Sequence, residues 1–371
     1  MRRRISFSAA LLVLLLPGCE PAPDAADWEQ MSDRAEAEAM ERSLEQNSGT
    51  MTLDPVCEEC QIFTRTVATL GDRSDPASVG PIAEVAADSA LRTFYVHSST
   101  FGGQILVYGK DGRLIRTQGQ PGEGPGEFGG QLMLDVGRGD SLHVLQTRPP
   151  RYTVWTPAGE LARTVPIERR FQDFEVLPSG DLILNAPEPT PRGDTYRLVR
   201  LSPTGETLQV FDPTTEDDTG VYFRRIGVAG DWIWAASLAR WEVDAFDAEG
   251  RHRAHMTADP EWEAQAGFRP GLRPEPGTPI PGQTAGITGP SSGRVYLLTA
   301  LPAEGARFGD TQGPPYIRTL VQYFYLGRMQ VYAAGELQGI VVPMDRGHAQ
   351  RVIHGADGST RVEVLSLGYR R

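Results

Sequence analysis

Hydrophobic and polar positions alternate in short runs along most of the chain. Five segments read as an apolar strand, a tight turn containing glycine and a second strand: ILVYGKDGRLIRTQG, YTVWTPAGELARTVP, LVRLSPTGETLQVFD, EVDAFDAEGRHRAHM and MQVYAAGELQGIVVP. Such turns between alternating apolar runs are typical of β-hairpins. The turn glycines are Gly112, Gly159, Gly205, Gly250 and Gly335, so the first four recur about every 45 residues. The last interval is about twice as long.

A second pair of short strands precedes each hairpin, which gives four strands per period. This is typical of the blade of a β-propeller. Five blades are expected to start near residues 82, 130, 171, 222 and 283. The C-terminal segment RVIHGADGSTRVEVLSL supplies strands for a sixth blade, and IFTRTVATLG at 62–71 supplies its outer strand, so that no sheet edge stays open. We therefore predict an all-β, six-bladed β-propeller over residues 57–371, with four-stranded antiparallel blades and a ring closed by both termini.

The stretch GQPGEGPGEF, residues 119–128, lies between the first and second blades. Its glycines and prolines permit a sharp crossing between two small sheets, and Phe128 is expected to wedge between them. A phosphate-binding loop would need Gly-x-Gly-x-x-Gly opening a helix, or Gly-Lys-Ser/Thr. Residues 124–129 have the first glycine spacing, but Pro121 and Pro125 oppose the helix that it must open, and Gly-Lys-Ser/Thr does not occur.

The segment YGKDGRLIRTQGQPGEGPGEF resembles the NHL-like six-bladed β-propeller proteins of bacteria, in which an Asp-Gly hairpin precedes a Gly-rich crossing. CEECQIFTRTVATLGD resembles the start of such lipoproteins. The resemblance covers residues 57–371 and is strongest over 57–128. The later blades depart from it, because Ala-Gly, Thr-Gly or Glu-Gly replaces Asp-Gly and the crossing is not repeated. The resemblance implies a fold, not a shared activity.

The N-terminus has the features of a bacterial export signal. Residues 1–18 contain three arginines and an apolar run too short to span a bilayer, as in a signal peptide. LPGC resembles the bacterial lipobox, which implies cleavage before Cys19 and lipidation there. An ordinary secretory signal is the alternative. Residues 19–56 have few apolar positions and are expected to form a flexible tether. We expect a periplasm-facing lipoprotein of the bacterial cell envelope, with Glu20 favouring the outer membrane.

Two further cysteines, Cys57 and Cys60, form the motif CEEC. In an oxidising compartment a local disulfide is favoured, and free thiols are the alternative. A thioredoxin-like role would need a helix after the motif, but the segment that follows reads as a strand. A zinc site would need two more ligands, which no second CxxC or nearby histidine supplies.

The chain carries a formal net charge of −12 and a single lysine, Lys110. A chain this acidic fits nucleic acid and anionic membrane surfaces poorly. We therefore expect no nucleic-acid partner and contact with the membrane through the lipid anchor only. We also expect the protein to be a monomer. Schiff-base chemistry would rest on one lysine in a hairpin turn, so we do not expect it.

Carboxylates recur at one position of the predicted inner strands: Glu84, Asp135 and Glu175. Inner strands line the channel of a propeller, so these three could bind calcium or another hard cation. Water-facing carboxylates without a metal are the alternative, and no cofactor is expected otherwise. His252 and His255 are three residues apart and should point to opposite faces of a strand, so they make a poor metal pair.

Two further features bear on binding. Residues 258–292 and 301–317 read as Pro/Gly-rich insertions. Loops on one face of a ring often bind partners, and passive insertions without a binding role are the alternative. Trp232, Trp234 and Trp241 are expected to pack between blades.

The sequence favours an envelope-anchored binding or scaffold propeller for an unassigned small ligand or envelope protein, without evident catalysis. The alternative is a metal-dependent propeller hydrolase or lyase, similar to lactonases, with its site in the central channel. No catalytic residue is assigned, because no Gly-x-Ser-x-Gly elbow occurs.

Overall fold

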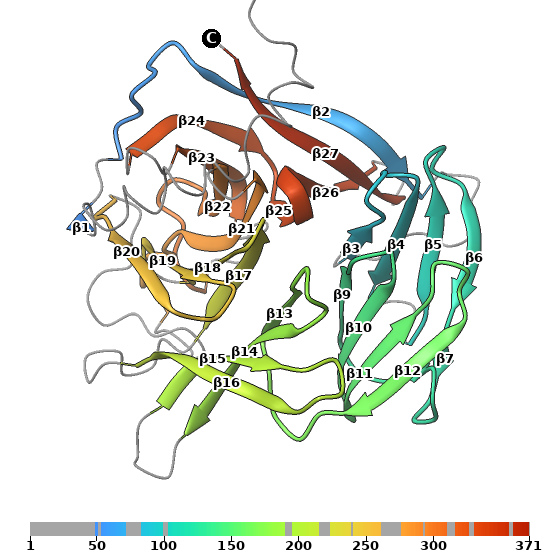
Figure 1. Ribbon diagram of the computed structural model, residues 1–371. Coiled ribbons are helices and arrows are strands. Elements are labelled where there is room, and N and C mark those ends of the chain that lie inside the picture. Colours follow the sequence, from blue (N-terminus) through green and yellow to red (C-terminus); the bar gives the residue numbers. More distant parts are fainter. Residues whose placement is uncertain are drawn as a thin grey trace, which may run out of the picture.

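Six small β-sheets stand around a central channel in the computed structural model (Figure 1). The chain is all-β apart from one turn of 3-10 helix, η4 (Asp345–Gly347), among the described residues. The structure describes residues 49–50, 53–71, 83–98, 103–189, 195–214, 223–238, 240–260, 276–291, 294–309, 316–325, 330–355 and 359–370. The predicted signal peptide, Cys19 and most of the predicted tether lie outside these residues.

The first three blades each take four strands that follow one another in sequence, from the channel outwards. Blade 1 consists of β3 (Ala83–Ala87), β4 (Thr93–Ser98), β5 (Ile105–Gly109) and β6 (Leu114–Gln118). Blade 2 consists of β9 (Leu132–Val136), β10 (Leu142–Thr147), β11 (Pro150–Trp155) and β12 (Leu161–Pro166). Blade 3 consists of β13 (Asp173–Val176), β14 (Leu182–Pro189), β15 (Thr195–Leu201) and β16 (Thr207–Pro213).

Blades 4 and 5 continue this order, and blade 6 joins the two ends of the chain. Blade 4 consists of β17 (Arg224–Ala229), β18 (Trp232–Ser237), β19 (Glu242–Asp247) and β20 (His252–Thr257). Blade 5 consists of β21 (Gln283–Ser291), β22 (Arg294–Pro302), β23 (Tyr316–Tyr325) and β24 (Gln330–Gln338). Blade 6 consists of β25 (Val341–Met344), β26 (His348–His354), β27 (Thr360–Arg370) and, from the other end of the chain, β2 (Gln61–Leu70). The six-bladed architecture and the five predicted blade starts are confirmed.

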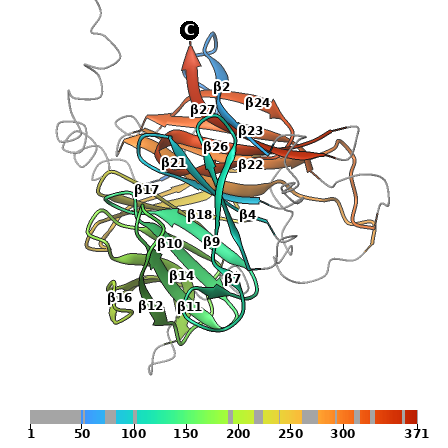
Figure 2. The same cartoon turned by 90° about the vertical axis from the view of Figure 1, so that its right-hand side faces the viewer.

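The ring closes where β2 pairs antiparallel with β27, from Gln61 opposite Arg370 to Leu70 opposite Val362. Both figures place the blue β2 beside the red β27 (Figures 1 and 2). Leu70 and Val362 are fully buried in a cluster that joins blade 6 to blade 1. Without β2, β27 would present an unpaired edge. The predicted closure by strands from both termini is confirmed.

The core lies between neighbouring blades, because each sheet can bury its faces only against the next one. One cluster combines apolar side chains of blades 1 and 2, and another, with Trp232, Trp234 and Trp241, joins blades 4 and 5. Trp241 also donates a hydrogen bond from Nε1 to Gln322 Oε1 of blade 5, at 2.8 Å. The tryptophans therefore pack between blades, as predicted.

The Gly/Pro-rich crossing connects β6 to β9, as predicted. Within it, β7 (Gln120–Pro121) pairs in parallel with β8 (Glu127–Phe128). Phe128 is 1% exposed and packs in the cluster shared by blades 1 and 2. Gly119 has a φ of 76°, and a Cβ there would overlap the Phe128 ring, so a side chain at this position is excluded twice over.

Buried Arg151 of β11 holds the crossing loop in place. Its guanidinium donates to the backbone oxygens of Glu123, Gly124 and Glu127 at 2.8 to 2.9 Å. These three bonds tie the backbone of the crossing to blade 2, and Gly124 O also accepts from the amide of Glu127.

The prediction of a fifth hairpin turn at Gly335 is wrong. Gly335 lies inside β24 and pairs with Val321 of β23. A Cβ at this position would lie 3.0 Å from Cβ of Ile62, so the glycine permits close approach of β2 to blade 5. The turn that joins β23 to β24 lies outside the described residues.

The two predicted insertions meet beside blade 5. Backbone hydrogen bonds join Gly277 and Thr278 to Phe308, and Ile280 to Ala306. The first insertion is shorter than predicted, because residues from Gln283 onward form β21. Residues 261–275 and 310–315 lie outside the described part of the chain.

The end of the predicted tether already contacts the ring. β1 (Gly49–Thr50) adds a parallel fifth strand to blade 4, and the amides of Val56 and Cys57 donate to carbonyls of blade 5. Cys57 and Cys60 form a disulfide, and Cys60 is buried between blades 5 and 6. Among the described residues, no helix is long and apolar enough to cross a membrane.

Phe128→Ala is expected to lower the free energy of unfolding by about 3–5 kcal/mol, because it leaves a cavity between blades 1 and 2. Chemical denaturation measures the effect. The control is Ile115→Ala on the outer strand of blade 1, where the side chain is 58% exposed, and its expected cost is about 0.5 kcal/mol or less. Equal losses in the two variants would contradict the wedge role of Phe128.

Candidate cation site in the central channel

Six carboxylates line a cavity of about 120 Å³ at the centre of the ring: Glu84, Asp135, Asp173, Glu175, Asp345 and, directly after β3, Asp88. The first four stand on the inner strands β3, β9 and β13, and Asp345 begins η4 after β25. Strands in an antiparallel blade are joined at alternate ends. The turn with Asp345 therefore lies at the face of the ring opposite the paired insertions.

Three of these carboxylates join neighbouring inner strands. Asp135 accepts from the amide of Val176 in blade 3, at 2.6 Å, and Asp173 accepts from Ile226 in blade 4, at 3.1 Å. Glu84 accepts from the amide of Leu134 in blade 2. The inner strands pair only within their own blades, so a side chain supplies the acceptor for each of these amides. Glu84, Asp135 and Asp173 therefore have a structural role between blades.

Asp135, Glu175 and Asp345 nevertheless converge. Each offers a carboxylate oxygen, and these oxygens all lie within 4.8 Å of one another. The turn that carries Asp345 is held from blade 5, because Gly347 donates its amide to Thr288 Oγ1 at 3.0 Å. Arg346 in the same turn has a φ of 58°, a conformation that non-glycine residues adopt only where the surroundings require it.

The predicted trio is therefore corrected in one member. Asp135 and Glu175 come together as expected, but Asp345 takes the place that Glu84 was expected to fill. Glu84 lines the same cavity outside the cluster. Asp345 was missed because the wrong turn at Gly335 concealed β25, the inner strand of blade 6. Once Val341–Met344 is placed there, the Asp-Arg-Gly turn after it falls at the channel.

Burial and mutual repulsion dominate the electrostatics of the site. Burial, followed by the neighbouring Asp345, holds the pKa values of Asp135 and Glu175 well above their usual range. Burial raises the pKa of Glu84 to about 7. Arg225, Arg346 and His348 also line the cavity, and burial lowers the pKa of His348, which favours neutral imidazole. A group of carboxylates this close must either hold protons or bind a cation.

The donor set fits a hard divalent cation. Ca²⁺ takes carboxylate, carbonyl and water oxygens at about 2.3–2.6 Å. The three convergent carboxylates provide such oxygens, and each lies on a backbone element fixed by other contacts. The cavity has room for an ion and a few waters, since one water fills about 30 Å³ of liquid.

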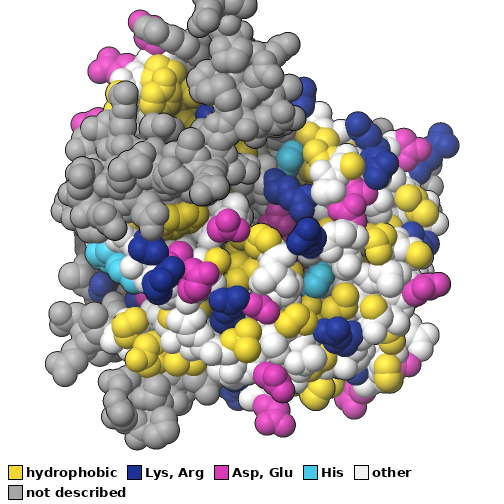
Figure 3. All heavy atoms as spheres, in the orientation of Figure 1, with side chains coloured by type: hydrophobic (Ala, Val, Ile, Leu, Met, Phe, Trp, Pro, Cys, Tyr) yellow, Lys and Arg dark blue, Asp and Glu magenta, His cyan; other side chains and the backbone are white. Residues whose placement is uncertain are grey.

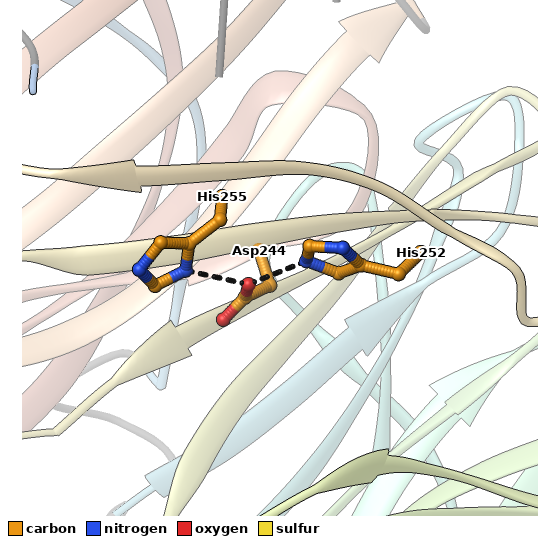
Figure 4. A group of neighbouring side chains, drawn as sticks. All are labelled: Asp244, His252 and His255. Atoms are coloured by element: carbon orange, nitrogen blue, oxygen red, sulfur yellow. Dashed lines mark hydrogen bonds and ion pairs between the residues drawn. The ribbon is translucent and has the colours of Figure 1, made fainter. Parts of the chain in front are cut away.

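A second group with metal-ligand donors lies far from the inner strands, on β19 and β20 of blade 4: Asp244, His252 and His255 (Figure 4). The prediction that the two histidines point to opposite faces is wrong. Ala245 pairs with Ala254 and Phe246 pairs with His252, so the ladder contains a β-bulge at Arg253. The extra residue shifts the alternation by one, and both imidazoles therefore face Asp244.

The comparisons with known proteins concern the fold. No protein-family model matches the sequence, and no curated protein is significantly similar to it. Among solved structures, one described as an exported protein of Bacteroides fragilis is 8% identical with a TM-score of 0.58, over 87% of this chain and 99% of that one. A member of the DUF4221 family from Bacteroides vulgatus is 10% identical with a TM-score of 0.55, over 84% and 99%. At such identities the likeness shows the fold alone: this chain is a six-bladed β-propeller.

Glu84→Gln is expected to stabilise the metal-free protein at pH 8 by about 1–3 kcal/mol. The folded chain binds the Glu84 proton more tightly than the unfolded chain, so stability falls as pH rises from about 4.5 through about 7. Glutamine removes this loss and keeps an oxygen for the Leu134 amide, so little gain is expected at pH 4. Denaturant titrations in chelator at both pH values measure the effect. Exposed Glu160→Gln is the control, and equal gains at both pH values would contradict the assignment.

Proposed function

We propose that this chain is an NHL-like propeller lipoprotein of the bacterial cell envelope that binds a partner or ligand around a hard divalent cation, Ca²⁺ in the first place, held in its central channel. The observation that carries the proposal is the convergence of Asp135, Glu175 and Asp345 from three different blades. A cation there would neutralise three close carboxylates and tie blades 2, 3 and 6 together. The lipidated Cys19 would keep the ring at the membrane.

The size of the cavity favours binding over catalysis. Pockets for drug-sized ligands have volumes of about 300–1,000 Å³, whereas this cavity has about 120 Å³. An ion with its waters fits, and an organic substrate of ordinary size would need the mouth of the channel as well. A partner would therefore meet the ion from the rim.

The charges on one face of the ring also favour binding of a selected partner over general binding of polyanions. Acidic and basic side chains are interspersed over the coloured part of the face in Figure 3. The described part of this face therefore has no basic patch of the kind that attracts polyanions such as nucleic acid.

A metal-dependent hydrolase or lyase is the second candidate, and one observation favours it. His348 lines the same cavity as the three carboxylates, and its lowered pKa favours the neutral imidazole that a general base requires. His348 would take a proton from a water bound to the cation. Lactone hydrolysis by the calcium-loaded protein, lost in His348→Gln with calcium binding retained, would favour this candidate over the binding function.

Asp345→Asn is expected to weaken calcium binding by at least tenfold, because it removes one of three charged ligands. Isothermal titration of the tag-free full chain in detergent gives affinity and stoichiometry, with one ion per chain expected. The control is Asp111→Asn, an exposed carboxylate in the first hairpin. No saturable binding by the unsubstituted chain, or equal affinity in both variants, would contradict the channel site.

Cys19→Ser is expected to move the protein from the membrane fraction to the soluble fraction, because the lipid is the proposed anchor. Fractionation of producing cells shows the distribution, and mass spectrometry of the N-terminal peptide shows the lipid. The control is Ser179→Ala in an exposed turn of blade 3, which has no such effect in this account. Unaltered membrane association of Cys19→Ser would refute the lipid anchor.

A further inference from the structure

The cluster of Asp244, His252 and His255 has a geometry that a structural hydrogen bond alone does not require. One oxygen, Asp244 Oδ1, lies 2.8 Å from His252 Nε2 and 2.9 Å from His255 Nδ1 (Figure 4). The three potential ligand atoms lie within 4.8 Å of one another. The bulge at Arg253 brings this about, because it turns both imidazoles to the face of blade 4 that carries Asp244.

The other oxygen of Asp244, Oδ2, is held by a buried arginine. Arg224 Nη2 donates to Asp244 Oδ2 at 2.8 Å and also contacts Glu242 at 2.7 Å, and Nε contacts Asp212 at 3.3 Å. Arg224 is 2% exposed, so this carboxylate is held by a buried and fully charged partner. Carboxylates that ligate metals are themselves oriented by such outer hydrogen bonds.

The charged groups around Asp244 favour the binding of a cation. Three carboxylates, on Asp212, Glu242 and Asp244, face the two buried guanidinium groups of Arg197 and Arg224. Apart from the two imidazoles, this group has one negative charge in excess. Arg240 is exposed at the edge of the same cavity, where solvent screens its charge.

We propose that Asp244, His252 and His255 form a second metal site, selective for a borderline transition-metal ion such as Zn²⁺. Two imidazole nitrogens and one carboxylate oxygen are a donor set used by catalytic zinc sites, with metal–ligand distances of about 2.0–2.2 Å. Tetrahedral coordination at these lengths places ligand atoms about 3.3 Å apart. The observed spacings to Asp244 Oδ1 need to open by only about half an ångström, within the reach of side-chain rotation.

The site is open to a fourth ligand. The side chains of His252 and His255 are 51% and 46% exposed, and they line a cavity of about 590 Å³ between blades 3 and 4. Water or an anionic oxygen ligand from solvent completes the coordination. Nitrogen donors separate this site from the all-oxygen channel site, which suits Ca²⁺.

The test is competition for Zn²⁺ between a chromophoric chelator and the full chain, purified in detergent without a histidine tag. We expect one Zn²⁺ per chain bound with submicromolar affinity and not displaced by millimolar Ca²⁺. His252→Ala and His255→Ala should each weaken binding by about tenfold or more, and the double variant should abolish it. The matched control is His354→Ala, an exposed histidine of blade 6.

Thermal melting of the variants in chelator shows whether they fold without metal. Both imidazoles are half exposed, so the single variants should fold. Asp345→Asn should leave Zn²⁺ binding unchanged, so the two proposed metal sites can be tested independently. Visible absorption of the Co²⁺-loaded chain gives an independent readout, with intense bands for low coordination by nitrogen that disappear in the single variants. Absence of saturable Zn²⁺ binding, or undiminished binding in the folded variants, would overturn the proposal and leave a structural hydrogen-bond cluster.

Discussion

The pairing of β2 with β27 is the constraint on which the rest of the structure depends. Each blade buries its faces only against its two neighbours, so an open ring would expose a sheet edge and a face at both ends. The N-terminal strand supplies the outer edge of the last blade, and fully buried Leu70 and Val362 then join blade 6 to blade 1. Closure also fixes the position of β25, and with it the turn that carries Asp345 into the channel.

Closing six inner strands around one axis creates a problem of hydrogen bonding that the carboxylates solve. The innermost strands do not pair with one another, and Asp135 and Asp173 accept from amides of the next blade. The same solution crowds negative charge into a narrow channel, where burial penalises it. A bound cation would resolve that conflict, so the structural and proposed functional roles of Asp135 follow from one arrangement.

The sequence predicted the architecture because it repeats. Hairpin glycines at regular intervals, alternating apolar strands and the need to cover a last edge were sufficient for the blade count, the closure and the burial of Phe128. The predictions failed where one residue changes the register. Gly335 was read as a turn, although it lies in a strand that must admit Ile62. That error concealed Asp345.

The histidines of blade 4 show the same limit. Strict alternation places His252 and His255 on opposite faces, but the bulge at Arg253 puts them on one face. Similar register shifts follow the hairpins of blades 1, 2 and 3. A repeat alignment that allowed one extra residue after each hairpin turn would have revealed the pair. The buried network around Arg224 carries no such signal, because its members come from strands of two blades and meet only in the folded ring.

The proposed function requires a cation bound by the channel carboxylates. Anomalous diffraction from crystals of the protein grown with Tb³⁺, a lanthanide substitute for Ca²⁺, tests it most directly. We expect a strong anomalous peak within bonding distance of carboxylate oxygens of Asp135, Glu175 and Asp345. A channel without a peak, with lanthanide bound only at surface carboxylates, would contradict it and leave the three acids as protonated structural groups.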